Sequence, residues 1–142
     1  MKQKLPNKRP LTMTRCILFF VLLAGFAVSS PEGLQAQEQV SARVSKVQDG
    51  DTFTLSGTSR RIRIWGLDAP EWDEAGGSLA TDTLRRLIAG NTLDCLVRDV
   101  DRYGRIVGQC FLPDGRDIAA EMIRSGTATE YCRFSRDYYG TC

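Results

Sequence analysis

Apolar and polar residues alternate in several short runs after residue 37, and such alternation is typical of half-buried strands. The first run is interrupted by Asp49-Gly50, a pair that favours a hairpin turn between two strands. A later run must leave the sheet at Pro70, because proline cannot donate a hydrogen bond to a ladder. The pattern predicts five strands, at residues 40–44, 52–55, 61–67, 93–97 and 106–112.

Apolar residues at helical spacing predict two helices, at residues 78–89 and 117–125. Ser78 is a suitable N-cap for the first helix, and Gly90 and Gly126 stand where helices commonly end. Five short strands with a helix between the third and the fourth are the order of a small OB barrel. The expected fold is therefore α+β, a five-stranded OB-fold β-barrel with two helices.

The first 36 residues differ from the rest of the chain. Basic residues without acids stand in positions 1–15, an uncharged apolar run fills 16–28, and small residues lead to Ala36. This order is typical of a secretory signal peptide. An uncleaved membrane anchor is the alternative, but the run would rise only about 20 Å as a helix against roughly 30 Å of hydrocarbon. We expect a signal peptide at 1–36 and one exported domain at 37–142, periplasmic or secreted, with no stable membrane association after processing.

The charge of the predicted mature domain excludes binding through bulk basicity. The whole chain has 19 Lys and Arg and 17 Asp and Glu, and the leader takes away five of the former and one of the latter. The remaining net charge is −2, whereas nucleic-acid binders recognised by overall charge are basic. Any contact with nucleic acid must therefore depend on a local site.

Four cysteines follow the predicted leader, an even number that suits disulfides in an oxidising compartment. A structural zinc site is the alternative, but the chain has no CxxC pair and no histidine. Cys95 and Cys110 fall in the middle of two neighbouring predicted strands, so we pair them, which leaves Cys132 with Cys142. Each bridge should stabilise the fold by about 2–4 kcal/mol.

Carboxylates gather at two of the predicted strand ends. Asp49 and Asp51 flank the first turn, and Asp68 and Glu71 follow the third strand. Without histidine, a hydrolytic water must be activated by a carboxylate, a metal or both. Oxygen-only sites suit hard cations such as calcium. Because these strand ends can approach each other in an OB barrel, we expect the acids to face one cleft.

Three sequence blocks, in this order along the chain, resemble the staphylococcal nuclease (thermonuclease) family. They are VQDGDTF at 47–53, RIRIWGLDAPE at 61–71 and DRYGR at 101–105, and GRD at 115–117 with the following helix adds to them. The resemblance covers about residues 40–131. One block alone would be weak, whereas the series is specific.

The resemblance implies a calcium (Ca²⁺) site and a base. Asp51 and Asp68 match carboxylate ligands, Ala69 stands where the family contributes a main-chain carbonyl, and Asp49 matches an acid that shapes the site. Glu71 matches the general base that orients the attacking water.

The resemblance also implies a phosphate site. Arg63 and Arg105 match the two arginines that bind the phosphate, and Tyr103 matches a residue beside it. The resemblance implies an aromatic contact to the base from the region after the second helix, and we expect Tyr131 among the substrate-binding residues. The alternatives for that aromatic contact are Phe134, Tyr138 and Tyr139.

By resemblance we expect a monomeric, calcium-dependent nuclease that hydrolyses DNA or RNA to products with 3′-phosphates. A non-catalytic OB-type nucleic-acid binding module is the competing hypothesis, and an exported structural domain is a third. The family archetype carries a third helix after the second, whereas this chain ends soon after residue 131. We expect the Cys132–Cys142 loop to replace that packing.

Overall fold

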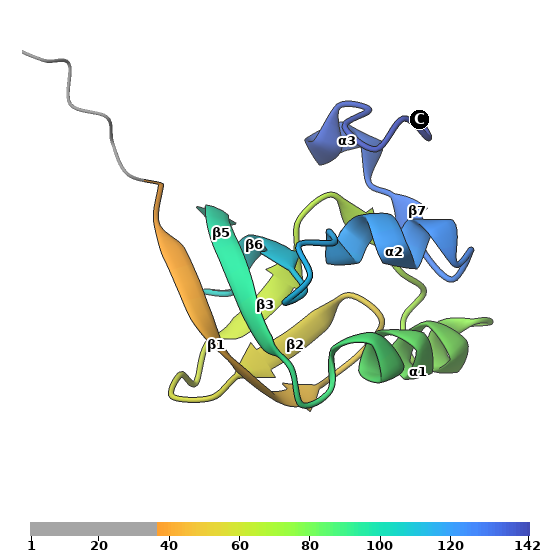
Figure 1. The fold of residues 1–142 in the computed structure, drawn as a ribbon. Coiled ribbons are helices and arrows are strands. Elements are labelled where there is room, and N and C mark those ends of the chain that lie inside the picture. The colour runs from red at the N-terminus through yellow and green to blue at the C-terminus, as the bar shows by residue number, and fades with distance from the viewer. Residues whose placement is uncertain (1–36) are drawn as a thin grey trace, which may run out of the picture. The chain divides into compact units, whose positions relative to one another are not determined.

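The alternating segments form strands that close into a barrel (Figure 1). The structure is a computed structural model that describes residues 37–142. The predicted signal peptide lies outside the described residues. The strands of the barrel, in the order in which they pair, are β1 (Gln39–Val47), β2 (Thr52–Leu55), β3 (Arg61–Ile64), β6 (Ile106–Phe111) and β5 (Thr92–Val100). Only the β3–β6 pair is parallel among these. The α+β barrel expected from the sequence is confirmed.

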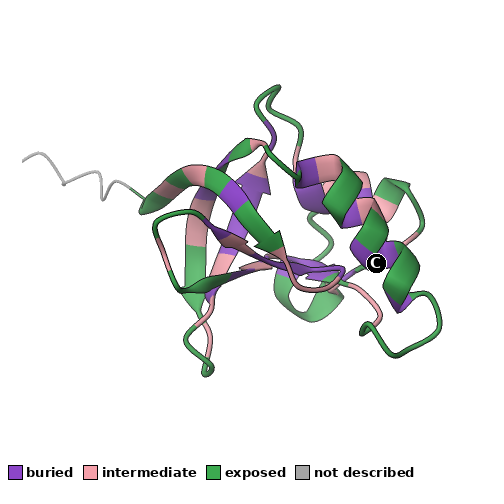
Figure 2. Cartoon of the chain, turned by 90° about the horizontal axis from the view of Figure 1, so that it is seen from below, coloured by how far each residue is buried: buried purple, intermediate pink, exposed green. Residues whose placement is uncertain are grey.

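The barrel interior is filled by the apolar residues of the alternating strands. Phe53, Ile62 and Leu93 are fully buried, and Figure 2 shows buried and exposed positions following one another along the strands. Cys95 and Cys110 pair across β5 and β6 and form a buried disulfide with a Cα–Cα distance of 4.0 Å. This predicted bridge is confirmed.

Two helices pack on the barrel. The helix α1 (Gly77–Ile88) buries Ala80, Leu84 and Ile88. It starts after Gly76 without a side-chain cap, so Ser78 as N-cap was wrong. The helix α2 (Ile118–Arg124) begins at Asp117, whose carboxylate accepts the N–H groups of the first helical turn. None of the helices in residues 37–142 has the length and apolar character needed to cross a membrane.

The C-terminal part differs from the prediction. The strand expected at 61–67 breaks at Trp65-Gly66, and its last residues form β4 (Leu67–Asp68), which pairs with β7 (Thr129–Glu130). Both predicted helices are present, and a further short helix, α3 (Cys132–Ser135), follows, which the sequence pattern did not indicate. A long-range hydrogen bond from the Tyr131 N–H to the Gly66 carbonyl (2.8 Å) fixes where this segment starts.

The disulfide Cys132–Cys142 closes the C-terminal segment, as predicted. Its Cα–Cα distance is 5.7 Å, within the usual range for a bridge. The bridge ties α3 to the last residue of the chain. It therefore holds the segment that begins at Tyr131.

Candidate active site

The turn between β1 and β2 buries Asp51. Its side chain accepts a hydrogen bond from the Thr52 hydroxyl (2.8 Å), and its N–H donates to Asp49 (3.1 Å). Asp51 is only 5% exposed. A side chain at Gly50 would place its Cβ 2.7 Å from the Ala80 Cβ and 2.8 Å from that of Ala69. The turn can thus pack against α1 only with glycine at this position.

One guanidinium joins the two predicted carboxylate ligands. Nη1 of Arg63 lies 2.7 Å from Oδ2 of Asp51, and Nη2 lies 3.6 Å from Oδ1 of Asp68. Nη2 also donates to the Leu67 carbonyl at 3.5 Å. The β3 strand therefore places a half-buried cation between acids from two separate chain segments. The structure thus brings Asp51 and Asp68 to the same guanidinium.

The surroundings of Asp51 favour its neutral form. Burial raises the pKa of Asp51 to about 6, although the Arg63 charge and the Thr52 hydroxyl act in the opposite direction. The nearby Asp49 carboxylate adds to the rise. A further cation that binds Asp51 would stabilise its ionised form and lower its pKa.

Glu71 lies in the exposed loop after β4. Together with Asp68 and Ala69 it lines a hollow of about 670 Å³. Its N–H donates to Oε2 of Glu74 (3.1 Å), while its own carboxylate makes no hydrogen bond or ion pair within residues 37–142. A Cβ at Gly77 would lie 1.7 Å from the Glu71 carbonyl oxygen, so the start of α1 packs directly on the main chain of this residue.

The 101–105 loop holds Arg105 through Asp101. Oδ2 of Asp101 accepts from Nε of Arg105 (2.7 Å), and Oδ1 accepts from the Arg105 and Tyr103 N–H groups (2.9 Å each). Partial burial acts to raise the pKa of Asp101, but the hydrogen bonds from Arg105 and Tyr103 outweigh it and lower the pKa. Asp101 was not assigned a role from the sequence. The Asp-x-Tyr-x-Arg spacing was the available signal, because aspartate commonly binds main-chain N–H groups two residues on.

A second hollow gathers the predicted phosphate and base contacts. This cavity of about 650 Å³ is lined by Arg63, Tyr103, Arg105 and Tyr131, among others. Glu71 and Arg105 therefore line different hollows. The Arg63–Asp68 contact connects them, because Arg63 lines one hollow and Asp68 the other.

The donors around Arg63 suit a hard cation. Asp51 and Asp68 offer carboxylate oxygens, and Ala69, which follows Asp68 in the chain and lines the same hollow, offers its main-chain carbonyl. Another acidic group in residues 37–142, formed by Glu130, Asp137 and Cys142, does not suit one. Cys142 is in a disulfide, and Glu130 already accepts hydrogen bonds from Tyr139 and Thr141.

Several known proteins are similar in sequence to this chain. The sequence model of staphylococcal nuclease homologues matches residues 61–140. A relative from Escherichia coli, named an uncharacterized endonuclease, is 38% identical over 100 residues, which cover 69% of this chain and 65% of the relative. A relative of the same name from Haemophilus influenzae is 28% identical over 132 residues, or 91% of this chain and 68% of the relative.

A staphylococcal-like nuclease from Arabidopsis thaliana is similar over a shorter stretch. It is 36% identical over 76 residues, which cover 54% of this chain and 23% of the plant protein. The chain thus spans about 65% of the length of the Escherichia coli relative and a smaller share of the plant one.

Proposed function

Since this chain belongs to the family of staphylococcal nuclease homologues, we propose that it is a calcium-dependent nuclease that hydrolyses phosphodiester bonds of DNA or RNA. The observation that carries the proposal is the placement of Arg63 between the carboxylates of Asp51 and Asp68 (2.7 and 3.6 Å). A structural salt bridge needs only one acid for each arginine. A site that binds a metal ion and a phosphate side by side needs carboxylates for the metal ion and a guanidinium for the phosphate. The names of the relatives from Escherichia coli and Arabidopsis thaliana support the same class of activity.

Asp51, Asp68 and the main-chain carbonyl of Ala69 would hold the calcium ion. When bound, calcium would polarise a phosphate oxygen and offset charge that develops during hydrolysis. Release of the Asp51 carboxylate from part of its contact with Arg63 would free that guanidinium for phosphate. The raised pKa of Asp51 supports a role as ligand, because a cation stabilises the ionised form of a buried acid.

Arg63 and Arg105 would bind the non-bridging oxygens of the scissile phosphate. A guanidinium presents its donors in a fixed plane and binds an anion through two of them at once. Asp101 holds Arg105 through Nε, which leaves the terminal nitrogens of that guanidinium for phosphate. Tyr103 lines the same cavity, beside the proposed phosphate position, and Tyr131 would contact the base.

Glu71 would orient the attacking water and accept its proton. Its carboxylate has no partner among the described residues, and Glu71 lines the same hollow as Asp68. The water oxygen would form the new bond to phosphorus while the bond to the 5′ oxygen breaks. The products would be a 3′-phosphate and a 5′-hydroxyl.

We also propose that the enzyme works outside the cytoplasm as a monomer. Two disulfides within residues 37–142 support an oxidising compartment, because such bridges are rare in reducing ones. Small exported domains often contain disulfides, because their small hydrophobic cores alone give only marginal stability.

The test measures degradation of single-stranded DNA and RNA with calcium, then after EDTA. We expect cleavage that chelation abolishes, and a loss of about 10²–10⁴-fold in kcat for Glu71→Gln. Asp73→Asn removes a charge from the same loop and is the matched control, with activity within about two-fold of the parent. Binding without cleavage by the parent protein would instead indicate the non-catalytic module. Cleavage that resists EDTA would rule out the calcium part of the proposal.

A further inference from the structure

Three further arginines line the same cavity as Arg63 and Arg105. Arg102 lies over the ring of Tyr103 at 4.7 Å, beside the proposed phosphate position, and the other two lie over other rings. These two are Arg98, on β5, and Arg133, on α3. Each lies over an aromatic ring that is also part of the cavity wall: Arg98 over Trp65 at 5.2 Å, and Arg133 over Phe134 at 6.0 Å. Guanidinium groups stacked on rings are held in place without losing their charge.

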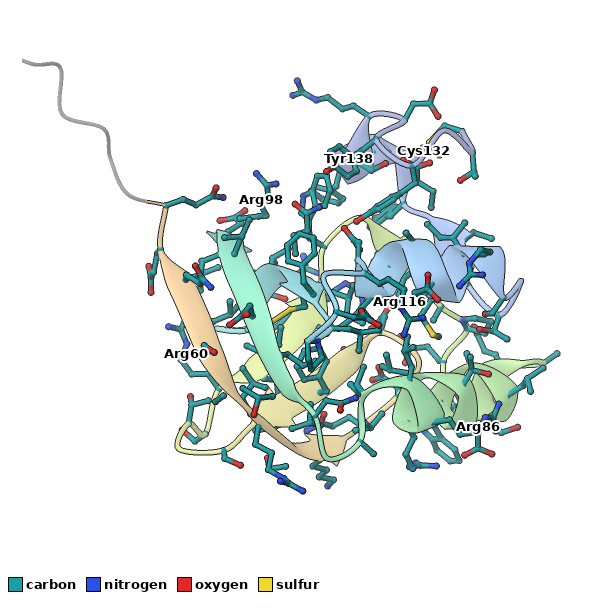
Figure 3. The ribbon with its side chains drawn as sticks, in the orientation of Figure 1. Arg60, Arg86, Arg98, Arg116, Cys132 and Tyr138 are labelled. Carbon is teal, nitrogen blue, oxygen red and sulfur yellow. A yellow bond between two sulfur atoms is a disulfide. The ribbon has the colours of Figure 1, made fainter. Side chains whose placement is uncertain are left out.

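The surroundings of Arg98 fix its orientation. Its Nη2 donates to Oε1 of Gln109, a side chain that is 1% exposed. Gln109 in turn donates to Asp117 (2.7 Å) and to the Tyr138 hydroxyl (3.3 Å). Figure 3 shows Arg98 and Tyr138 on the same side of the barrel. A hydrogen bond to a buried amide and contact with the Trp65 ring thus position the guanidinium.

Arg133 is held more loosely, beside exposed aromatic surface. Its side chain makes no hydrogen bond and no ion pair with the residues from 37 to 142. Phe134 is 57% exposed and packs edge-on against Tyr131, with ring centroids 4.9 Å apart. An exposed ring and an unpaired guanidinium thus lie next to each other at the cavity wall. A ligand that is both anionic and planar would cover both.

The charges of these two arginines are not compensated, unlike those of the catalytic pair. Arg63 and Arg105 form ion pairs with Asp51 and Asp101 at 2.7 Å. Arg98 and Arg133 have no carboxylate within 4 Å in the described part of the chain. Asp99 also lines the cavity, and one of its oxygens accepts its neighbour's N–H. The cavity therefore carries positive charge that no carboxylate pairs with, in a domain whose predicted net charge is negative.

We propose that Arg98 with Trp65, and Arg133 with Phe134, form a second nucleotide subsite for a single-stranded nucleic acid. The two guanidiniums bind phosphates that flank the scissile one, and the two rings stack on the adjoining bases. Single strands are the substrate class, because only unpaired bases can present their faces to aromatic side chains. This inference rests on the proposed function, since it extends the same cavity.

The test compares two double variants of the full chain with its disulfides formed. Arg98→Gln/Arg133→Gln removes the subsite, and Arg43→Gln/Arg86→Gln removes the same charge from exposed arginines outside the cavity. Arg86 lies on α1, away from Arg98 in the view of Figure 3. The probe is a fluorescein-labelled 12-nucleotide thymidine oligomer, bound by Glu71→Gln protein so that hydrolysis does not interfere. Affinity is measured by anisotropy at several salt concentrations.

We expect the subsite variant to bind about ten-fold more weakly at about 0.1 M salt. The slope of log affinity against log salt should fall by about 1.4, or roughly 0.7 for each of two phosphates. The control pair should change affinity less than two-fold. In otherwise native protein, kcat/KM should fall about ten-fold on the 12-mer. On a single-nucleoside nitrophenyl phosphodiester, which cannot reach the subsite, the fall should be several-fold smaller.

Failure of the subsite and failure of the nuclease proposal give different results. Equal loss of affinity in both double variants, or equal loss of kcat/KM on long and minimal substrates, would overturn the subsite while hydrolysis remains. Equally tight binding of a 12-base-pair duplex would overturn the single-strand assignment. Binding with the expected slopes but no hydrolysis of any substrate would support the subsite and refute the nuclease.

Discussion

Asp51 and Arg63 meet because of the register between β2 and β3. Thr52 lies opposite Arg63 in the antiparallel pair, and the Ile64 N–H donates to the Asp51 carbonyl at 2.8 Å. The side chain of Asp51, one residue before Thr52, thus reaches the guanidinium at 2.7 Å. A shift of one residue would turn Arg63 to the other face of β3. The contact between acid and cation is therefore fixed by main-chain pairing.

Asp51 should make the metal-free protein less stable as pH rises. Burial raises its pKa from 3.8 to about 6, so the folded protein holds a proton that the unfolded chain has released in this window. The free energy of unfolding should then fall by roughly 3 kcal/mol between about pH 4 and pH 7. Thermal unfolding of the EDTA-treated protein at each pH measures this. Asp51→Asn should flatten the slope, and Asp73→Asn should not.

The sign of that slope is the critical result. A rise in Tm from pH 4 to pH 6 that disappears in Asp51→Asn would show that the Arg63 charge outweighs burial, contrary to the expected pKa. Saturating calcium should raise the Tm of the parent at pH 7 and leave that of Asp51→Asn nearly unchanged.

Replacing Arg63 by lysine should reduce activity although the charge is kept. Lysine offers a point charge and cannot contact Asp51 and a phosphate through one planar group. We expect kcat/KM on single-stranded DNA to fall on the order of 10²–10³-fold, as for loss of a donor to developing charge. Arg61→Lys is the control, because Arg61 is two residues away on the same strand and exposed. An active Arg63→Lys enzyme would remove Arg63 from the catalytic set.

Much of the barrel was predictable because its signals are local. Strand 52–55 was placed with its correct bounds by the alternation between two turns. The Cys95–Cys110 pair followed from the neighbouring positions of two strands, and the two cysteines lie opposite each other in the β5–β6 pairing. The Asp49-Gly50 turn was expected where it occurs, although Gly50 is required for close packing rather than for an unusual backbone angle.

The C-terminal part was not predictable, because distant contacts determine it. The two-stranded sheet of β4 and β7 pairs residues about 60 positions apart, and no periodicity marks a two-residue strand. The helix α3 has four residues, too few for an apolar stripe to show. Ser78 failed as an N-cap since the Gly76-Gly77 pair lets α1 start earlier, against the main chain of Glu71.

Glu130 should make the fold sensitive to strong acid. Its partial burial acts to raise the pKa, but hydrogen bonds from Ser135, Tyr139 and Thr141 outweigh this and lower it to about 2. The stabilisation is present above pH 4.5, the value for the unfolded chain, and is lost as pH falls through about 2. Glu130→Gln should remove this acid-dependent part of the Tm between pH 5 and pH 2.

Two measurements distinguish the effect of protonating Glu130 from the effect of protonating other carboxylates. Glu38→Gln, in an exposed position, should keep the acid slope of the parent. Glu130→Gln should also alter the near-ultraviolet circular dichroism of the tyrosines, because one of the two carboxylate oxygens that accept from Tyr139 and Thr141 becomes an amide nitrogen. An unchanged slope in Glu130→Gln would show that the carboxylate does not anchor the C-terminal segment.

The two disulfides should differ in what their removal does. Closure of loops with separations of 15 and 10 residues predicts about 3 kcal/mol for each bridge from chain entropy. Cys95 and Cys110 are buried in the barrel, so serine at both positions also places hydroxyl groups in an apolar core. Cys132 and Cys142 are exposed, and serine there faces water.

We therefore expect Cys95→Ser/Cys110→Ser to lose roughly twice the unfolding free energy that Cys132→Ser/Cys142→Ser loses, since each buried hydroxyl adds about 1–3 kcal/mol. The C-terminal variant should keep its barrel but hold Tyr131 less firmly, because the bridge ties the segment after that residue. Urea unfolding gives the two free energies, and kinetics on the 12-mer should show a several-fold higher KM with kcat within about two-fold. Equal KM in the C-terminal variant and the parent would show that α3 keeps its place without the bridge, through Glu130 and the Tyr131–Gly66 hydrogen bond alone.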